Sequence, residues 1–165
     1  MKTIVLGALN AFTDPGQIGS KPSRLPLWLQ PLVSHLQSIA LLAARLYVAQ
    51  VFFLSGLTKV RDWSITLALF QDEYHVPLLP PELAAYMGTA GELGLPVLLV
   101  LGLGTRFAAV GLSFVNVMAV LSLAEIAPAA LAGHHLWGVL LVVIALWGAG
   151  RWSADAYLPI RAAGN

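Results

Sequence analysis

Apolar residues fill four long stretches of the chain, and polar residues gather in the segments between them. A helix needs about 20 mainly apolar residues to cross the hydrocarbon core of a bilayer. Four segments meet or approach this length, at about 38–57, 83–103, 106–126 and 133–148. The fourth reaches full length only if it begins near Pro128. The pattern predicts an all-α integral membrane protein, with a four-helix bundle over residues 38–150.

The flanking segments show patterns typical of helices that lie on the membrane surface. Over about 25–36, leucines recur at helical spacing just after two basic residues, which predicts an amphipathic helix within the N-terminal segment 1–37. Glycines that can end a helix follow the fourth span, and Ser153 can cap a short helix in the C-terminal segment 151–165. Ordered tails without such helices remain the alternative.

Composition supports a membrane protein and excludes other classes. Hydrophobic residues make up 58% of the 165 residues and charged residues 10%, whereas soluble domains contain about 25% charged residues. A chain this short could not bury so much apolar surface in water, so its first partner is the lipid bilayer. The net charge of +1 gives no reason to expect a nucleic-acid partner. Without cysteine, the chain cannot hold an iron–sulfur cluster by itself.

The distribution of Lys and Arg predicts the orientation, because cytoplasmic loops carry an excess of both. If both termini are cytoplasmic, that side holds Lys2, Lys21, Arg24, Arg106, Arg151 and Arg161. The opposite side then holds only Lys59 and Arg61. We therefore expect a multi-pass protein of the cytoplasmic membrane with both termini inside.

Four strongly polar residues lie deep in the predicted spans. Arg45 and Gln50 belong to the first span, Glu92 to the second and Asn116 to the third. At about 1.5 Å per residue, Arg45 and Glu92 differ in depth by only about 5 Å. We therefore expect an Arg45–Glu92 ion pair with Asn116 and Gln50 as hydrogen-bond partners. The pair could simply lock the bundle, or it could line a pocket for a quinone head group, a proton or another small ligand.

Small residues and one proline lie beside these charges. Gly56 and Gly88 share helical faces with Arg45 and Glu92, and small residues allow helices to approach closely. Pro96 follows Glu92 by four residues and would clash with its carbonyl in a regular helix. We expect a kink there that frees the Glu92 carbonyl to face the pocket.

The segment QDEYHVPLLPPEL at 71–83 joins the first two spans. Its prolines suit an extended connector followed by a helix start. The run VPLL is more apolar than an exposed loop requires. We expect the segment to fold back as a partial lid over the pocket, with Tyr74 and His75 at the rim.

Histidines provide a candidate metal site. His75, His134 and His135 all fall on the predicted outer face, where they could bind copper or zinc. No histidine lies near the middle of a predicted span, which argues against a haem held between helices by two imidazoles.

Four motifs, in order, resemble the DoxX family and most closely its HvfX-like subgroup. They are RLYVAQVFFLSGLTKVRDW, YHVPLLPPELAAY, GELGLPVLLVLGLGTRFAA and HHLWG…GAGRWSADAYL, within about 41–155. The matching residues are Arg45, Gly56, Lys59, Glu92, Gly102, Arg106, Trp137, Ser153 and Asp155. The third span, with LSFVNVMAVLSL, departs from the family pattern.

The resemblance implies a four-helix protein of the bacterial inner membrane. Three functions are compatible with the resemblance and with the polar residues. The first is a quinone-linked redox subunit, in which Arg45 or Lys59 would bind a carbonyl and Glu92 would carry protons, with Trp137 and Tyr74 in the pocket. The second is a non-enzymatic accessory of systems that make copper-binding modified peptides. The third is a small transporter. Each would work with a protein partner or as a homo-oligomer.

Overall fold

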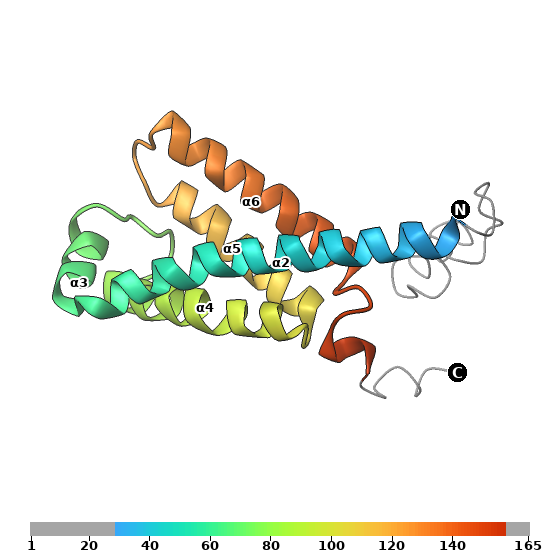
Figure 1. Cartoon of the computed structure of the whole chain (residues 1–165). Helices are drawn as coiled ribbons and strands as arrows, with labels where there is room; N and C mark the ends of the chain where they lie inside the picture. Colours follow the sequence, from blue (N-terminus) through green and yellow to red (C-terminus); the bar gives the residue numbers. More distant parts are fainter. Residues whose placement is uncertain (1–28, 158–165) are drawn as a thin grey trace, which may run out of the picture.

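The computed structural model describes residues 29–157, which form helices packed side by side (Figure 1). These residues contain five α-helices, a short 3₁₀ helix and no strand, which confirms the all-α class. The helices are α2 (Gln30–Arg61), α3 (Trp63–Asp72), α4 (Pro81–Leu101), α5 (Thr105–Leu121), α6 (Pro128–Trp147) and η2 (Ala154–Ala156).

The boundaries differ from the predicted spans in three places. The first predicted span is only part of α2, which is 32 residues long and already begins at Gln30. The predicted surface helix at 25–36 is therefore not separate from Gln30 onward, where it is part of α2. Most of the rest of that prediction lies outside the described residues. Helix α5 ends at Leu121, before the predicted end of the third span. Helix α6 begins at Pro128, which gives the fourth apolar segment its full length.

Helix α3 lies between the first two predicted spans, where no helix was predicted. Helix α2 ends because Asp62 has an extended backbone (φ −137°, ψ 92°). The Asp62 carboxylate then caps α3 by accepting a hydrogen bond of 3.1 Å from the Ile65 amide. Hydrogen bonding to Ser64 and to the Ile65 amide lowers the pKa of Asp62 below its usual value. The Thr66 hydroxyl donates to the Lys59 carbonyl at 2.9 Å, so that α3 is tied to the end of α2.

The helices pack as two pairs that are joined through α4 and α5. Helix α2 lies along α4, and α5 lies along α6. Near the middle the pairs share a core of Val48, Ala49, Phe52, Leu99, Ala108, Ala109, Leu112, Leu141 and Ile144. Toward the end of the molecule where α3 lies, α6 diverges from α2 (Figure 1). The fold therefore separates the two pairs at that end.

Close contact between α2 and α4 depends on Gly56. A Cβ atom at this position would lie 2.8 Å from the Leu93 side chain and 3.1 Å from the Glu92 Cβ. Such distances are shorter than ordinary van der Waals contacts, so a larger residue would push the helices apart. The predicted role of Gly56 as a small packing residue agrees with this geometry.

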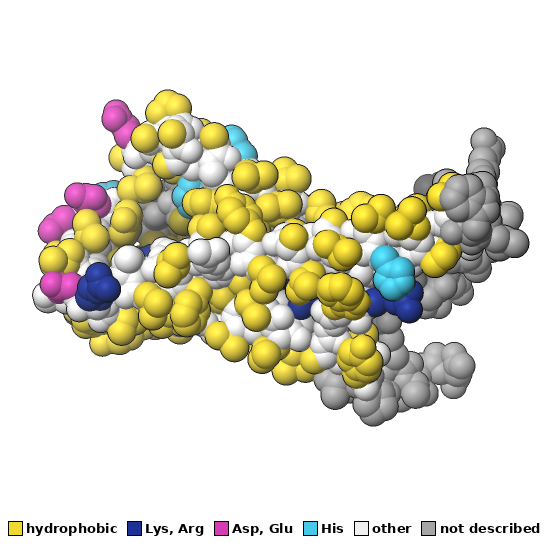
Figure 2. All heavy atoms as spheres, in the orientation of Figure 1, with side chains coloured by type: hydrophobic (Ala, Val, Ile, Leu, Met, Phe, Trp, Pro, Cys, Tyr) yellow, Lys and Arg dark blue, Asp and Glu magenta, His cyan; other side chains and the backbone are white. Residues whose placement is uncertain are grey.

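Apolar side chains cover the outer surfaces of the helices (Figure 2). Phe107, Phe114 and Val139 are each more than 60% exposed. Helices α2, α4 and α6 are long and apolar enough to cross a membrane, whereas α5 is a shorter apolar helix of 17 residues. A surface of this kind suits contact with lipid. The count of four spans stays a prediction.

The segment between α3 and α4 folds back onto the bundle, as predicted. The His75 amide donates to the Ser122 carbonyl at the end of α5, with a nitrogen–oxygen distance of 2.8 Å. Tyr74 packs edge-on against Phe70, with ring centres 5.1 Å apart. Val76 and Leu79 pack on the same small apolar cluster. The loop therefore bridges from the α2–α4 side to the end of α5.

A candidate ligand cavity between the helix pairs

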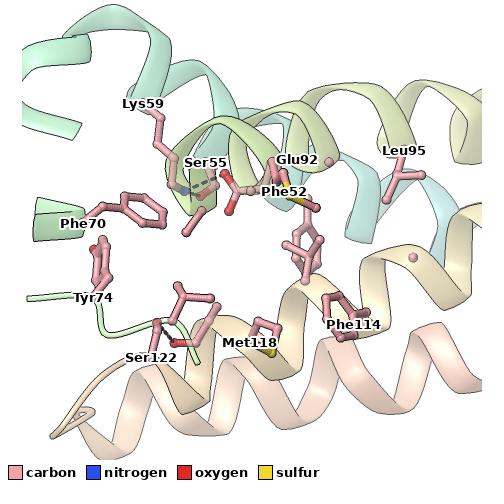
Figure 3. Close-up of a pocket in the computed structure, with 18 of the residues that line it drawn as sticks. Phe52, Ser55, Lys59, Phe70, Tyr74, Glu92, Leu95, Phe114, Met118 and Ser122 are labelled. Atoms are coloured by element: carbon pink, nitrogen blue, oxygen red, sulfur yellow. Dashed lines mark hydrogen bonds and ion pairs between the residues drawn. The ribbon is translucent and has the colours of Figure 1, made fainter. Parts of the chain in front are cut away.

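A cavity of about 520 Å³ lies where the two helix pairs diverge. Figure 2 shows the hollow on the surface, and Figure 3 shows the residues around it. Helices α2 and α4 supply one wall, α5 and α6 supply the other, and the segment after α3 closes one end. Most of the lining is apolar, and the polar or charged members are Ser55, Lys59, Tyr74, Glu92, Ser122 and His134. An apolar cavity of this size with few polar groups is typical of small-molecule sites.

An ion pair lies in the wall formed by α2 and α4. The Lys59 Nζ donates to the Glu92 Oε2 at 2.6 Å and to the Ser55 Oγ at 3.0 Å (Figure 3). The side chains are 20% and 9% exposed, respectively. Lys59 extends from the last turns of α2 back along the helix, since it contacts Ser55 four residues earlier. The pair places one cation and one carboxylate together at the cavity surface.

Arg45 does not form the predicted ion pair with Glu92. Its side chain is 1% exposed and donates to four backbone carbonyls. Two of these, on Leu99 and Val100, lie 2.9 Å from the guanidinium at the C-terminal end of α4. The other two belong to Ala149 and Trp152, which follow α6. Carbonyls at a helix C-terminus lack partners within the helix and carry partial negative charge, so they attract this cation.

The register of α2 against α4 explains this correction. Gly56 is the residue of α2 that packs against Glu92. Arg45 lies eleven residues before Gly56, which is about 16 Å along a helix. The predicted depths assumed two spans of similar length, whereas α2 is considerably longer than α4. Arg45 is therefore a structural residue here, not a cavity residue.

Asn116 was predicted to contact the ion pair and instead binds His134 on the opposite wall. Its Nδ2 donates to the His134 carbonyl at 2.9 Å, and its Oδ1 lies 2.8 Å from the His134 Nδ1. The His134 ring also packs edge-on against Trp137, with ring centres 4.9 Å apart. His134 and Trp137 both line the cavity. Asn116 is buried behind them and orients the histidine.

Gln50 and Pro96 lie on the other side of the α2–α4 pair. Gln50 is exposed and, with Pro96, lines a separate apolar groove. The predicted contact between Gln50 and the ion pair is therefore wrong. Helix α4 continues through Pro96, which is buried against its neighbours. The predicted opening of the Glu92 carbonyl toward the pocket stays a prediction.

The three outer histidines are not assembled into a metal site. Residues 29–157 contain no group of three His, Cys, Asp or Glu side chains that could hold a metal ion. His75 and His135 are exposed and do not line the cavity, whereas His134 does. Because α6 begins at Pro128, His134 lies in its second turn and not at its edge as predicted. Its neighbours Asn116 and Trp137 fix it as a cavity residue instead.

Tyr74 lies at the cavity end that the loop closes, as predicted. Burial and the nearby carboxylates of Glu73 and Glu92 raise the pKa of its hydroxyl above the usual value. The predicted partner at the rim, His75, contributes its backbone amide to Ser122 instead. Gly88, the other predicted packing glycine, also lines this end, and a Cβ there would lie 3.8 Å from Phe70.

The C-terminal residues that match the family motifs bind the turn between α4 and α5. The Asp155 carboxylate accepts hydrogen bonds from the Gly104 amide at 2.8 Å and the Thr105 amide at 3.0 Å, and so caps α5. Ser153 precedes η2, but its hydroxyl donates to the Gly150 carbonyl and does not cap that helix. The Arg106 guanidinium donates to the Leu146 carbonyl near the end of α6. These residues act far from the cavity.

Gly102 makes this arrangement possible. Its φ of +68° is in the left-handed region, and a Cβ would lie 2.5 Å from the Ser153 Cβ and 2.9 Å from the Arg45 guanidinium. The turn, the buried arginine and the C-terminal segment therefore form one packed unit. This unit brings Arg45, Gly102, Ser153 and Asp155 together in the structure.

Several cavity residues were not predicted from the sequence, among them Ser55, Ser122 and Phe70. Ser55 lies one helical turn before Lys59, which could have identified it as a neighbour. Phe70 comes from α3 and Ser122 from the end of α5. These two elements meet only through the fold of the connecting segment. No local pattern signals that contact.

Comparisons with known proteins agree with the membrane fold. The family model described as DoxX matches residues 40–125, which include Lys59, Glu92 and Asn116 but not His134. A protein of Haemophilus influenzae, named only as an uncharacterized protein, is 29% identical over 134 residues and covers 73% of this chain and 83% of its own length. No solved structure matches. The family match covers more than half of the sequence, and the chain therefore belongs to the DoxX family of membrane proteins.

Proposed function

We propose that the cavity binds the head group of a quinone and that the protein is a quinone-linked membrane subunit. The observation that supports this is the Lys59–Glu92 pair at the surface of an otherwise apolar cavity of about 520 Å³. Pockets of about 300–1,000 Å³ suit small organic ligands. A quinone head group is a flat apolar ring with two polar oxygens, which matches this combination.

The residues present fit such a ligand. An ammonium group has three donors, and the Lys59 Nζ uses two of them on Ser55 and Glu92. The third can donate to a quinone carbonyl. The Glu92 carboxylate beside it can accept or return a proton, while Phe52 and Trp137, 6.0 Å apart between ring centres, supply apolar surface. A bound quinone would supply the capacity to take up two electrons and two protons.

The proposed location and orientation of the protein rest on the charge pattern and the family. We place the chain in the bacterial cytoplasmic membrane as a four-span, HvfX-like member with both termini inside. The cavity then opens in the outer half, near the end where acidic residues gather (Figure 2). The chain contains no cysteine and so no iron–sulfur cluster of its own. We expect a partner protein to exchange electrons with the quinone.

Quinone binding to protein in lipid nanodiscs tests the proposal. The assay measures quenching of tryptophan fluorescence by a short-chain ubiquinone, and it also extracts and identifies quinones that copurify. Lys59→Met should weaken binding roughly tenfold or more, because a hydrogen bond from a charged group contributes about 1.5–3 kcal/mol. Gln50→Leu is the matched control, since it changes an exposed polar residue of the same helix outside the cavity. Absence of binding and of copurifying quinone would refute the proposal.

A further inference from the structure

The hydrogen bonds of Asn116 determine which nitrogen of His134 carries a proton. The His134 backbone carbonyl can only accept, so the amide group that faces it at 2.9 Å must be the NH₂. The Oδ1 atom is then the one 2.8 Å from the His134 Nδ1. Because Oδ1 can only accept, Nδ1 must donate. A neutral His134 is therefore protonated on Nδ1, and its Nε2 carries a free lone pair.

The Nε2 edge of the His134 ring has no partner among the described residues. His134 lines the cavity. The Nδ1 edge is held by Asn116, and the ring plane is fixed by edge-on packing against Trp137 at 73°. The wall formed by α5 and α6 therefore presents one oriented acceptor to a ligand.

The two cavity walls differ in what they can accept. Lys59 can donate to a carbonyl oxygen or a hydroxyl oxygen, and Glu92 beside it can accept from a hydroxyl. That wall can bind either redox form of a quinone. The Nε2 of His134 can only accept, so it binds a hydroxyl and repels the lone pairs of a carbonyl. The histidine is the group that distinguishes the two forms.

We propose that His134 makes the cavity selective for the reduced, hydroxyl-bearing form of its ligand, through a hydrogen bond from a quinol hydroxyl to Nε2. This inference rests on the proposed quinone function and adds the preferred redox form. His134 is a specificity-determining residue, and Asn116 is the positioning residue behind it. One additional hydrogen bond should favour quinol over quinone roughly three- to tenfold.

The first test compares the dissociation constants of a short-chain ubiquinol and the matching ubiquinone in nanodiscs. Anaerobic conditions at about pH 8 keep the quinol reduced and an ordinary histidine neutral. We expect the wild type to bind the quinol more tightly and His134→Phe, which keeps a ring beside Trp137, to bind both forms nearly equally. Asn116→Leu should lose part of the preference. His135→Phe, at the exposed neighbouring position, should retain it.

The second test reads the protonation of His134 in the wild-type protein and needs no ligand. Nitrogen-15 magnetic resonance of labelled histidine in the wild-type protein should show one residue protonated on Nδ1 and bare on Nε2, assigned through its loss in His134→Phe. Protonation on Nε2 would overturn the inference. Equal binding of both redox forms by the wild type would also overturn it while leaving the proposed function intact. If the wild type bound neither form, the proposed function and the inference would fall together.

Discussion

Replacing Arg45 with methionine should strongly destabilise the fold and leave ligand binding by the folded molecules nearly unchanged. Methionine is shorter but keeps an unbranched apolar stem, and it removes all four hydrogen bonds to carbonyls. These carbonyls belong to α4 and to the segment after α6. The substitution therefore releases the C-terminal segment from the end of α4.

The magnitude follows from the contacts. Four hydrogen bonds from a charged group, at about 1.5–3 kcal/mol each, give a gross loss of about 6–12 kcal/mol. Removing the guanidinium also recovers its desolvation penalty, which amounts to several kcal/mol for a buried ion. The difference between these two terms leaves a net loss of about 3–5 kcal/mol. We expect a loss of this size for Arg45→Met and a smaller loss for Arg45→Lys, which keeps the charge.

Unfolding by sodium dodecyl sulfate, followed by tryptophan fluorescence in mixed micelles, measures this difference. Quinone binding is measured on the same preparations and expressed per folded molecule. Gln50→Leu, an exposed change on the same helix, controls for general effects of substitution in α2. Unfolding free energy within about 1 kcal/mol of the wild type, together with lost quinone binding, would refute the structural role and restore Arg45 as a ligand residue.

Three further predictions concern the turn and the cavity rim. Gly102→Ala should lower the free energy of unfolding more than Gly104→Ala. Both backbones are left-handed, which costs about 1–2 kcal/mol for alanine, but only a side chain at Gly102 would contact Ser153 and Arg45. Equal losses for the two variants in the same assay would contradict this. Asp155→Ala should lower the free energy of unfolding by about 1 kcal/mol through loss of the α5 cap, and Asp155→Asn should lower it less. An Asn variant as unstable as the Ala variant would show that the charge, and not the hydrogen bonds, stabilises the helix. Tyr74 should ionise above its usual pH of 10.0, because burial and nearby carboxylates raise its pKa. Because the folded state then holds the proton more tightly, the stability that Tyr74 contributes is complete below that pH and is lost as the pH rises through the raised pKa. Ultraviolet titration of the wild type against Tyr74→Phe measures the pKa of Tyr74. If the titration step missing in Tyr74→Phe lies at or below pH 10, the prediction is wrong.

Hydrophobic pattern predicted the all-α class and the approximate positions of α4 and α6, because long apolar runs dominate these segments. It missed α3, although Asp62 is a good cap and Trp63, Thr66 and Phe70 recur at helical spacing. The residues between the first two predicted spans were expected to hold no helix. It also placed His134 at the edge of its helix, although Pro128 is a favourable first residue and moves the helix start upstream.

The partner of Glu92 shows the limit of arguments from depth in a membrane. Arg45 and Lys59 occupy the same face of α2, fourteen residues apart, which corresponds to about 21 Å along the helix axis. Glu92 can therefore pair with only one of them, and the depth estimate favoured Arg45, whereas the structure pairs it with Lys59. The choice depends on register, which is set by the close packing of Gly56 against Leu93 and Glu92. Once Gly56 faces Glu92, Lys59 is within reach at the next turn, and Arg45 faces the C-terminal carbonyls of α4. The packing of Gly56 therefore places Lys59 at the cavity and leaves Arg45 to hold the end of α4.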